Sequence, residues 1–175
     1  MKVDGIVGPG TLAAFDKALP ALVTIRPAPK PEDDLPESAE AKLKGVHNEL
    51  VAVVRLASVK SPIPFTVIEG LRTKERQAQL VKAGASKTSN SRHLTGHAVD
   101  LWPLDPKTMK TIPSDAAFPQ GSNEARAASA RLWSDLRKIA GYMREAAKEL
   151  GVMIEWGGDW GWDAVHFQLN RKAYP

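Results

Sequence analysis

Residues 91–100 of the chain read Ser91-Arg92-His93-Leu94-Thr95-Gly96-His97-Ala98-Val99-Asp100. This stretch places two histidines and a carboxylate around a glycine, and Asp163-Ala164-Val165-His166 adds a third histidine and a second carboxylate. Imidazole nitrogens and carboxylate oxygens are the usual ligands of a catalytic zinc ion, which takes three protein ligands and leaves a fourth position for water. The two stretches together predict a metal-dependent hydrolase.

The donor set favours an open, catalytic site over a closed, structural one. Structural zinc sites are often closed by thiolates, and the chain contains no cysteine. Two imidazoles and one carboxylate leave the metal with a net positive charge, which lowers the pKa of a bound water to about 7 and polarises a carbonyl. A further carboxylate can then act as the base.

The spacing within the first stretch indicates a loop followed by a strand. Gly96 interrupts any helical turn, and residues 97–102 have the composition of a strand. We therefore place His93 on the loop and Asp100 on the strand, with His97 on the opposite strand face and a poor ligand candidate. The alternative, a helical pair formed by His93 and His97, requires an intact helix that the glycine disfavours.

Two further strands are predicted near the C-terminus, at residues 151–156 and 164–169, separated by a glycine-rich turn. In the second of these, His166 points away from the apolar row. On the residues alone, His166 is as readily a core or surface histidine as a metal ligand. Asp163, three residues earlier and in the turn, allows a base and a ligand to converge on one metal.

The ordered motifs resemble a known family. The patterns Ser91-x-His93-x-x-Gly96-x-Ala98-x-Asp100 and Asp163-x-x-His166 are similar to the signature of the zinc peptidases that include D-alanyl-D-alanine carboxypeptidases and dipeptidases. The runs at residues 69–77, 88–100, 155–160 and 166–169 resemble more closely the branch that contains phage L-alanyl-D-glutamate endolysins. The resemblance spans residues 43–169 and implies a Hedgehog/DD-peptidase-like domain with a mostly antiparallel sheet flanked by helices.

The resemblance also implies roles for individual residues. It makes His93, Asp100 and His166 the Zn²⁺ ligands and Asp163 the catalytic base, with Arg72 holding a substrate carbonyl or carboxylate and Gln77 and Ser91 in the substrate pocket. A guanidinium suits the Arg72 role, because it is always charged and offers a rigid fork of donors. Glu155 and Asp159 are rival bases, and the family pattern favours Asp163.

The implied reaction is hydrolysis of a peptidoglycan stem peptide at the L-alanyl-D-glutamate bond, with water on the zinc as nucleophile and Asp163 as proton acceptor. Two alternatives stay open. A D-Ala-D-Ala carboxypeptidase or dipeptidase uses the same chemistry on a different bond. A non-catalytic zinc-containing module that binds the cell wall is the second, since Hedgehog domains share this fold.

Apolar periodicity predicts the rest of the domain, which we assign to residues 38–175. Residues at intervals of three and four predict helices over 43–57 and 123–150, and residues 73–83 are predicted to form a third helix. Together with the predicted strands, these helices indicate an α+β domain. His47 falls in the first of these and is read as non-catalytic. Residues 64–69 are predicted to form a strand, and residues 103–121 an irregular loop that is a candidate flank of the substrate groove.

The first part of the chain differs in character. Residues 1–22 resemble the second half of a peptidoglycan-binding repeat, in which Asp4-Gly5 turns and Thr11 caps a short helix. A segment of this length cannot bury its own core, so we expect it to pack on the catalytic domain. Residues 23–37 are rich in proline and charge and are predicted to form an extended linker.

Charge and segment composition set the expected partners and location. The chain of 175 residues has a formal net charge of +4, and basic residues crowd the segment from 72 to 92, which suits polyanionic cell-wall material. No nucleic-acid motif, transmembrane-length stretch or signal peptide is found, so neither nucleic acid binding nor membrane insertion is expected. We expect a monomer made in the bacterial host cytoplasm and released to the wall by a holin.

Overall fold

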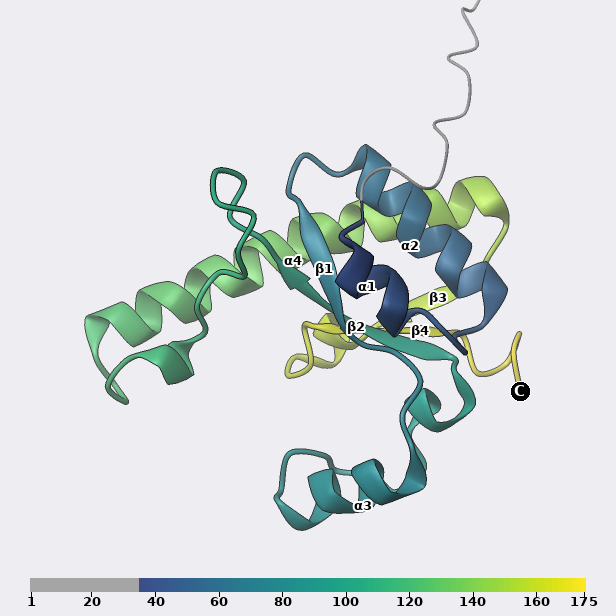
Figure 1. The fold of residues 1–175 in the computed structure, drawn as a ribbon, viewed down its shortest axis with the longest axis horizontal. Helices are drawn as coiled ribbons and strands as arrows, with labels where there is room; N and C mark the ends of the chain where they lie inside the picture. Colours follow the sequence, from purple (N-terminus) through teal and green to yellow (C-terminus); the bar gives the residue numbers. More distant parts are fainter. Residues whose placement is uncertain (1–34) are drawn as a thin grey trace, which may run out of the picture.

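The computed structural model describes residues 35–175, which form a four-stranded sheet with helices packed around it (Figure 1). The predicted repeat at residues 1–22, and the predicted linker up to residue 34, lie outside the described residues. The elements follow in the order α1 (Glu37–Lys42), α2 (Asn48–Lys60), β1 (Phe65–Glu69), α3 (Lys74–Lys82), η1 (Arg92–Thr95), β2 (Ala98–Pro103), η2 (Asp115–Ala117), α4 (Asn123–Leu150), β3 (Ile154–Trp156), η3 (Gly157–Trp160) and β4 (His166–Leu169).

The sheet has the strand order β1-β2-β4-β3, and each neighbouring pair is antiparallel. This confirms the α+β class with an antiparallel sheet. The register pairs Asp100 of β2 with His166 of β4 on one side and with Glu69 of β1 on the other. A register shift between Val67 and Glu69 marks a bulge, which re-aims the end of β1. Three polar residues therefore lie in one row across the sheet.

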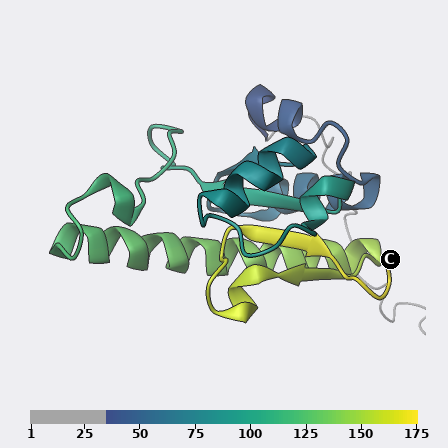
Figure 2. The same cartoon turned by 90° about the horizontal axis from the view of Figure 1, so that it is seen from below.

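The opposite face of the sheet carries the hydrophobic core. Helices α2 and α4 pack on each other and supply most of its helical residues, and α4 extends well beyond the sheet at its N-terminal end (Figures 1 and 2). Alternate strand residues point into this core: Phe65 and Val67 from β1, Val99 and Leu101 from β2, and Phe167 and Leu169 from β4. The period of two thus leaves Asp100 and His166 on the other face.

Helix α4 has the predicted bounds because both ends are capped. The hydroxyl oxygen of Ser122 accepts a hydrogen bond from the backbone N–H of Ala125 (3.0 Å). At the other end, Gly151 adopts a left-handed conformation with φ of 69°. No helix among residues 35–175 is both long and apolar enough to cross a membrane.

The helix predicted over residues 43–57 is interrupted. Residue Gly45 has a φ of 79°, and α2 begins only after His47, whose ring caps its first turn. Leu43 and Val46 are still buried, so the apolar spacing continues through the turn and concealed the break. The N–H of His47 donates to the carbonyl oxygen of Gly96 (2.8 Å), and this contact ties the break to the turn of the 91–100 motif.

The segment 103–121 is largely irregular, as predicted, with one isolated bridge between Leu104 and Thr111 and the short helix η2. It runs beside the N-terminal part of α4 (Figure 1). The pocket described below takes none of its lining residues from the loop that follows β2, so this segment does not flank the groove found here.

Candidate metal centre and active site

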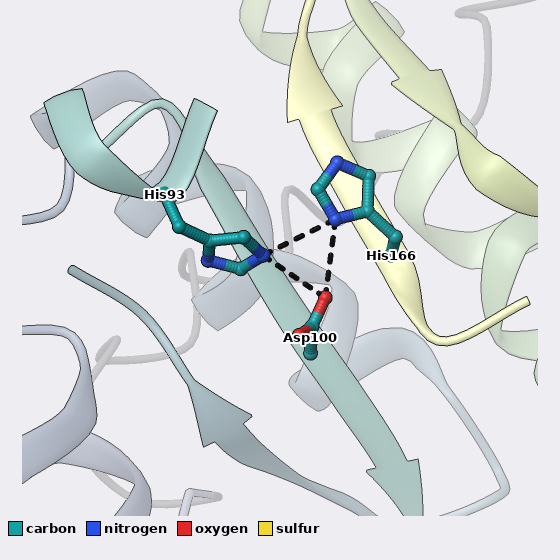
Figure 3. A group of neighbouring side chains, drawn as sticks. All are labelled: His93, Asp100 and His166. Atoms are coloured by element: carbon teal, nitrogen blue, oxygen red, sulfur yellow. Dashed lines mark hydrogen bonds and ion pairs between the residues drawn. The ribbon is translucent and has the colours of Figure 1, made fainter. Parts of the chain in front are cut away.

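The structure brings the three predicted metal ligands together (Figure 3). His93 comes from η1, Asp100 from β2 and His166 from β4. The Nε2 atom of His93 lies 3.2 Å from Oδ1 of Asp100 and 3.2 Å from Nδ1 of His166, and this Nδ1 lies 3.1 Å from the same oxygen. One atom from each residue therefore points to a common centre.

These separations fit a tetrahedral cation. Ligand atoms about 2.0–2.1 Å from a zinc ion lie about 3.3 Å from one another in a tetrahedral arrangement. The Nδ1 of His93 hydrogen-bonds the carbonyl oxygen of Gly70 (2.8 Å), so that nitrogen carries the proton and Nε2 of a neutral ring is an acceptor. Three acceptor atoms then face one point, an arrangement that a bound cation stabilises.

Burial and hydrogen bonding act in opposite directions on the pKa values of two residues of the cluster, Asp100 and His166. Burial alone would raise the pKa of Asp100, but its hydrogen bonds with His166 and His93 outweigh burial and bring that pKa far below its usual range. Burial lowers the pKa of His166, but the hydrogen bond and the charge of Asp100 raise it overall. Ligands of this kind must release protons when they bind a metal, which makes metal affinity depend on pH.

A pocket opens over the cluster. Three further residues that the sequence assigned to the site line its walls: Arg72, Ser91 and Asp163. Lys87, Trp160 and Trp162 line it as well. Both tryptophans are about half exposed (43% and 52%), and the Lys87 ammonium lies 4.3 Å from the ring centre of Trp162. The pocket therefore joins the cluster to a surface suited to an elongated, partly charged substrate.

Asp163 is the available carboxylate in this pocket. Burial is the largest cause that raises its pKa, the nearby charge of Asp100 adds to it, and His166 and His93 oppose it. Its carboxylate has no hydrogen-bond partner among residues 35–175. The turn before it requires Gly157, where a Cβ atom would lie 2.4 Å from the Asp163 carbonyl oxygen. The geometry thus leaves this group available to accept a proton.

Arg72 is buried beside the cluster, with a side chain 7% exposed. Its guanidinium makes a two-pronged contact with Glu69 (2.8 and 2.6 Å) and donates to the amide oxygen of Gln77 (2.6 Å). The nitrogen Nη2 lies 3.6 Å from Oδ2 of Asp100. The bulge in β1 that re-aims Glu69 thus fixes Arg72 at the pocket wall, with further N–H donors left for a substrate oxygen.

Gln77 and Ser91 occupy different places. Gln77 is 2% exposed and lies behind Arg72, with its amide nitrogen donating to Ser86 Oγ (2.8 Å) and to the carbonyl of Thr88. Ser91 lines the pocket, and its hydroxyl oxygen also accepts from the backbone N–H of His93 (3.4 Å). Gln77 is therefore placed to orient Arg72, and Ser91 both caps η1 and borders the cavity.

The alternative bases, Glu155 and Asp159, and the alternative ligand, His97, lie outside the cluster and its pocket. Glu155 accepts hydrogen bonds from Gln168 and Asn170, and Asp159 forms an ion pair with Arg144 (2.6 Å). Neither carboxylate is among the groups that line the pocket. His97 hydrogen-bonds Thr95 (2.9 Å), outside the cluster. The sequence analysis preferred Asp163 to Glu155 and Asp159 as the base, and Asp100 to His97 as a ligand. The preferred residues are the ones that lie at the cluster and its pocket.

Sequence reasoning missed Gln168, which is 3% exposed and contacts His166. It also assigned no part to Glu69. A signal for Gln168 was present, since a residue two positions from a strand ligand shares its face. No comparable signal existed for Glu69, because its position depends on a bulge.

Comparison with known proteins shows the family of this chain. Residues 34–116 match the family model described as phage L-alanyl-D-glutamate peptidase, and residues 84–169 match the model described as D-alanyl-D-alanine carboxypeptidase. The solved structure of the Serratia marcescens L-Ala D-Glu endopeptidase ChiX superposes with a TM-score of 0.65 at 39% identity, over 82% of this chain and 96% of that one. The chain belongs to the family of L-alanyl-D-glutamate peptidases.

Two curated relatives of this peptidase are phage proteins. The L-alanyl-D-glutamate peptidase of Escherichia phage T5 is 29% identical over 145 residues, which cover 79% of the present chain and 90% of the relative. The L-alanyl-D-glutamate peptidase of Listeria phage A118 is 35% identical over 119 residues, which cover 67% of the present chain but only 34% of the relative. The two family matches together span residues 34–169, which include His93, Asp100 and His166.

Proposed function

We propose that this peptidase hydrolyses the L-alanyl-D-glutamate bond of peptidoglycan stem peptides with a zinc ion held by His93, Asp100 and His166. The observation that carries the proposal is the convergence of three ligand atoms beside an aspartate that has no hydrogen-bond partner in the described part of the chain. The relatives named for this bond support the choice of substrate.

Zinc in this cluster would supply an acidified water and a Lewis acid for the scissile carbonyl. Asp163 is the residue that accepts the proton, because it borders the pocket and its carboxylate makes no hydrogen bond with the described residues. After accepting the proton, Asp163 returns it to the departing amine, so one carboxyl group serves as base and then as acid.

Arg72 orients the substrate and stabilises negative charge on the carbonyl oxygen. Its guanidinium is held by Glu69 and Gln77, so it need not reorganise as charge develops. Gln77 acts through Arg72, and Ser91 contributes a polar edge to the pocket. The exposed rings of Trp160 and Trp162 extend the substrate surface away from the cluster.

A D-Ala-D-Ala carboxypeptidase activity is the second candidate, favoured by the family model matched over residues 84–169. The endopeptidase is preferred because the relatives that cover most of the chain carry that description. A purely wall-binding role is disfavoured by the placement of Arg72 and Asp163 in the pocket with the cluster.

The phage origin of two relatives supports a setting for this activity. We infer that the protein is made in the host cytoplasm and reaches the wall after holin-type release, acting as a monomer on peptidoglycan and not on nucleic acid. Resident Zn²⁺ is part of the proposal, supported by the donor set.

Mass spectrometry of fragments released from purified peptidoglycan tests the proposal. New peptides with a free N-terminal D-glutamate are expected with the intact protein, lost with a chelator and restored by zinc. Release of free D-alanine instead would identify a carboxypeptidase. No product from a zinc-loaded protein would contradict hydrolysis altogether.

A further inference from the structure

The polar face of β4 carries a buried side chain, Gln168, that has no part in the proposed reaction. His166 and Gln168 lie two residues apart and therefore share a face of the strand. On the neighbouring strand β3, Glu155 is the cross-strand partner of Gln168. A row of side chains thus runs from the metal cluster along β4 and across to β3.

Each step in this row is a hydrogen bond. The Nε2 atom of His166 lies 3.1 Å from the amide oxygen of Gln168, and the amide nitrogen of Gln168 donates to Oε2 of Glu155 (2.6 Å). The other oxygen of Glu155 accepts from the side-chain amide of Asn170 (2.7 Å). Gln168 is 3% exposed, so water has little access to these contacts.

The donor and the acceptor of each hydrogen bond in this row are fixed. The NH₂ group of Gln168 donates to Glu155, whose two carboxylate oxygens both accept hydrogen bonds. The carbonyl oxygen of Gln168 must then face His166, where it can only accept. The proton of a neutral His166 ring is thereby favoured on Nε2, and Nδ1 is left as an acceptor toward Asp100.

We propose that Gln168 and Glu155 are positioning residues that set the ring orientation and tautomer of His166, so that its Nδ1 is presented to the metal. The inference rests on the proposed zinc site and adds the groups that prepare one ligand. His93 is prepared differently, since a backbone carbonyl, that of Gly70, holds its other nitrogen. Partners of this kind support metal affinity by about 10–100-fold.

Zinc affinity, measured by competition with a chromogenic chelator, tests the proposal without relying on activity. Gln168→Leu removes the acceptor at similar volume and is expected to weaken zinc binding by about 10–100-fold. Glu155→Gln, which allows the Gln168 amide to turn, is expected to weaken it less. Asn170→Ala is the matched control, because it removes a partner of Glu155 that does not lead to His166.

The outcomes separate the possible failures. Failure of the wild-type protein to bind zinc would contradict the proposed function itself. Wild-type zinc affinity in Gln168→Leu, with a raised KM, would overturn the inference and assign Gln168 to substrate binding, since it also borders the pocket. Equal losses in Asn170→Ala and Gln168→Leu would also overturn it, as a general loosening of the strand.

A measurement on the wild-type protein guards against poor folding of the variants. In the ¹⁵N NMR spectrum of the zinc-loaded protein, the Nε2–H of His166 is expected as a ring proton protected from solvent exchange by Gln168. An Nε2–H that exchanges as fast as that of an exposed histidine would contradict the hydrogen bond on which the inference depends.

Discussion

Two aspartates border the same pocket, and their surroundings give them opposite properties. Asp100 lies within β2, hydrogen-bonded to both cluster histidines, and its pKa is far below the usual range because these bonds outweigh burial. Asp163 lies in the turn before β4 without such partners, and burial raises its pKa. One carboxyl group is therefore held as an anion, and the other is tuned toward proton exchange.

The difference assigns roles without reference to residue type. Two titratable groups whose environments separate their pKa values are suited to different tasks, here a metal ligand and a general base. The fold produces the difference, since the sheet register places Asp100 opposite His166, whereas the 157–163 turn leaves Asp163 beside the cluster but outside its hydrogen bonds.

The largest effect is expected from removing the ligand. Asp100→Ala takes an anionic donor from the cluster, so zinc affinity should fall by more than about 100-fold, because even residues that only orient a ligand cost about 10–100-fold. Zinc stoichiometry after dialysis, with turnover measured on the same samples, checks this. Asp159→Ala, which removes an exposed aspartate paired with Arg144, is the control. Retention of zinc at wild-type affinity would show that Asp100 is not a metal ligand and would remove its contrast with Asp163.

A smaller effect is expected from changing Arg72, whose guanidinium lies beside Asp100. Arg72→Lys keeps the charge but loses the fork that binds Glu69, so kcat/KM should fall by about 10²-fold while zinc affinity stays close to wild type. Arg131→Lys, in an exposed pair with Asp105, serves as the control. An equal loss of zinc affinity would show that Arg72 supports the ligand and not the substrate.

The smallest effect is a pH dependence of the stabilisation by zinc. The pKa of His166 is raised above its ordinary 6.5, so in the metal-free protein its contribution to stability is present below the unfolded pKa and lost as pH rises through the folded one. Zinc needs the neutral ring. The increase in Tm caused by zinc should therefore grow as pH rises above 6.5. Thermal unfolding with and without zinc measures it, and a constant increase would contradict the coupling.

Local signals were sufficient for several elements. Helix α4 was predicted with its observed bounds, since its apolar period is flanked by the cap residues Ser122 and Gly151. The strands of the site were found from their period of two, and the four residues predicted as ligands and base lie at one pocket because β2 and β4 are neighbours.

Other features depend on contacts between distant segments. The break at Gly45 follows from its close approach to Gly96, where an added Cβ would lie 2.2 Å from the Gly45 carbonyl oxygen. The Arg72 contact depends on the β1 bulge at Glu69, and the contact between Gln168 and Glu155 depends on the register of β3 with β4. No local pattern of residues encodes such pairings.

The most direct test of the account is Asp163→Asn, measured for zinc content and turnover of peptidoglycan in one preparation. The amide keeps the shape of the side chain but cannot accept the proton. We expect full zinc content at wild-type affinity with turnover reduced by about 10²–10⁴-fold. Loss of zinc along with turnover would make Asp163 a ligand, and turnover near wild type would exclude it as the base.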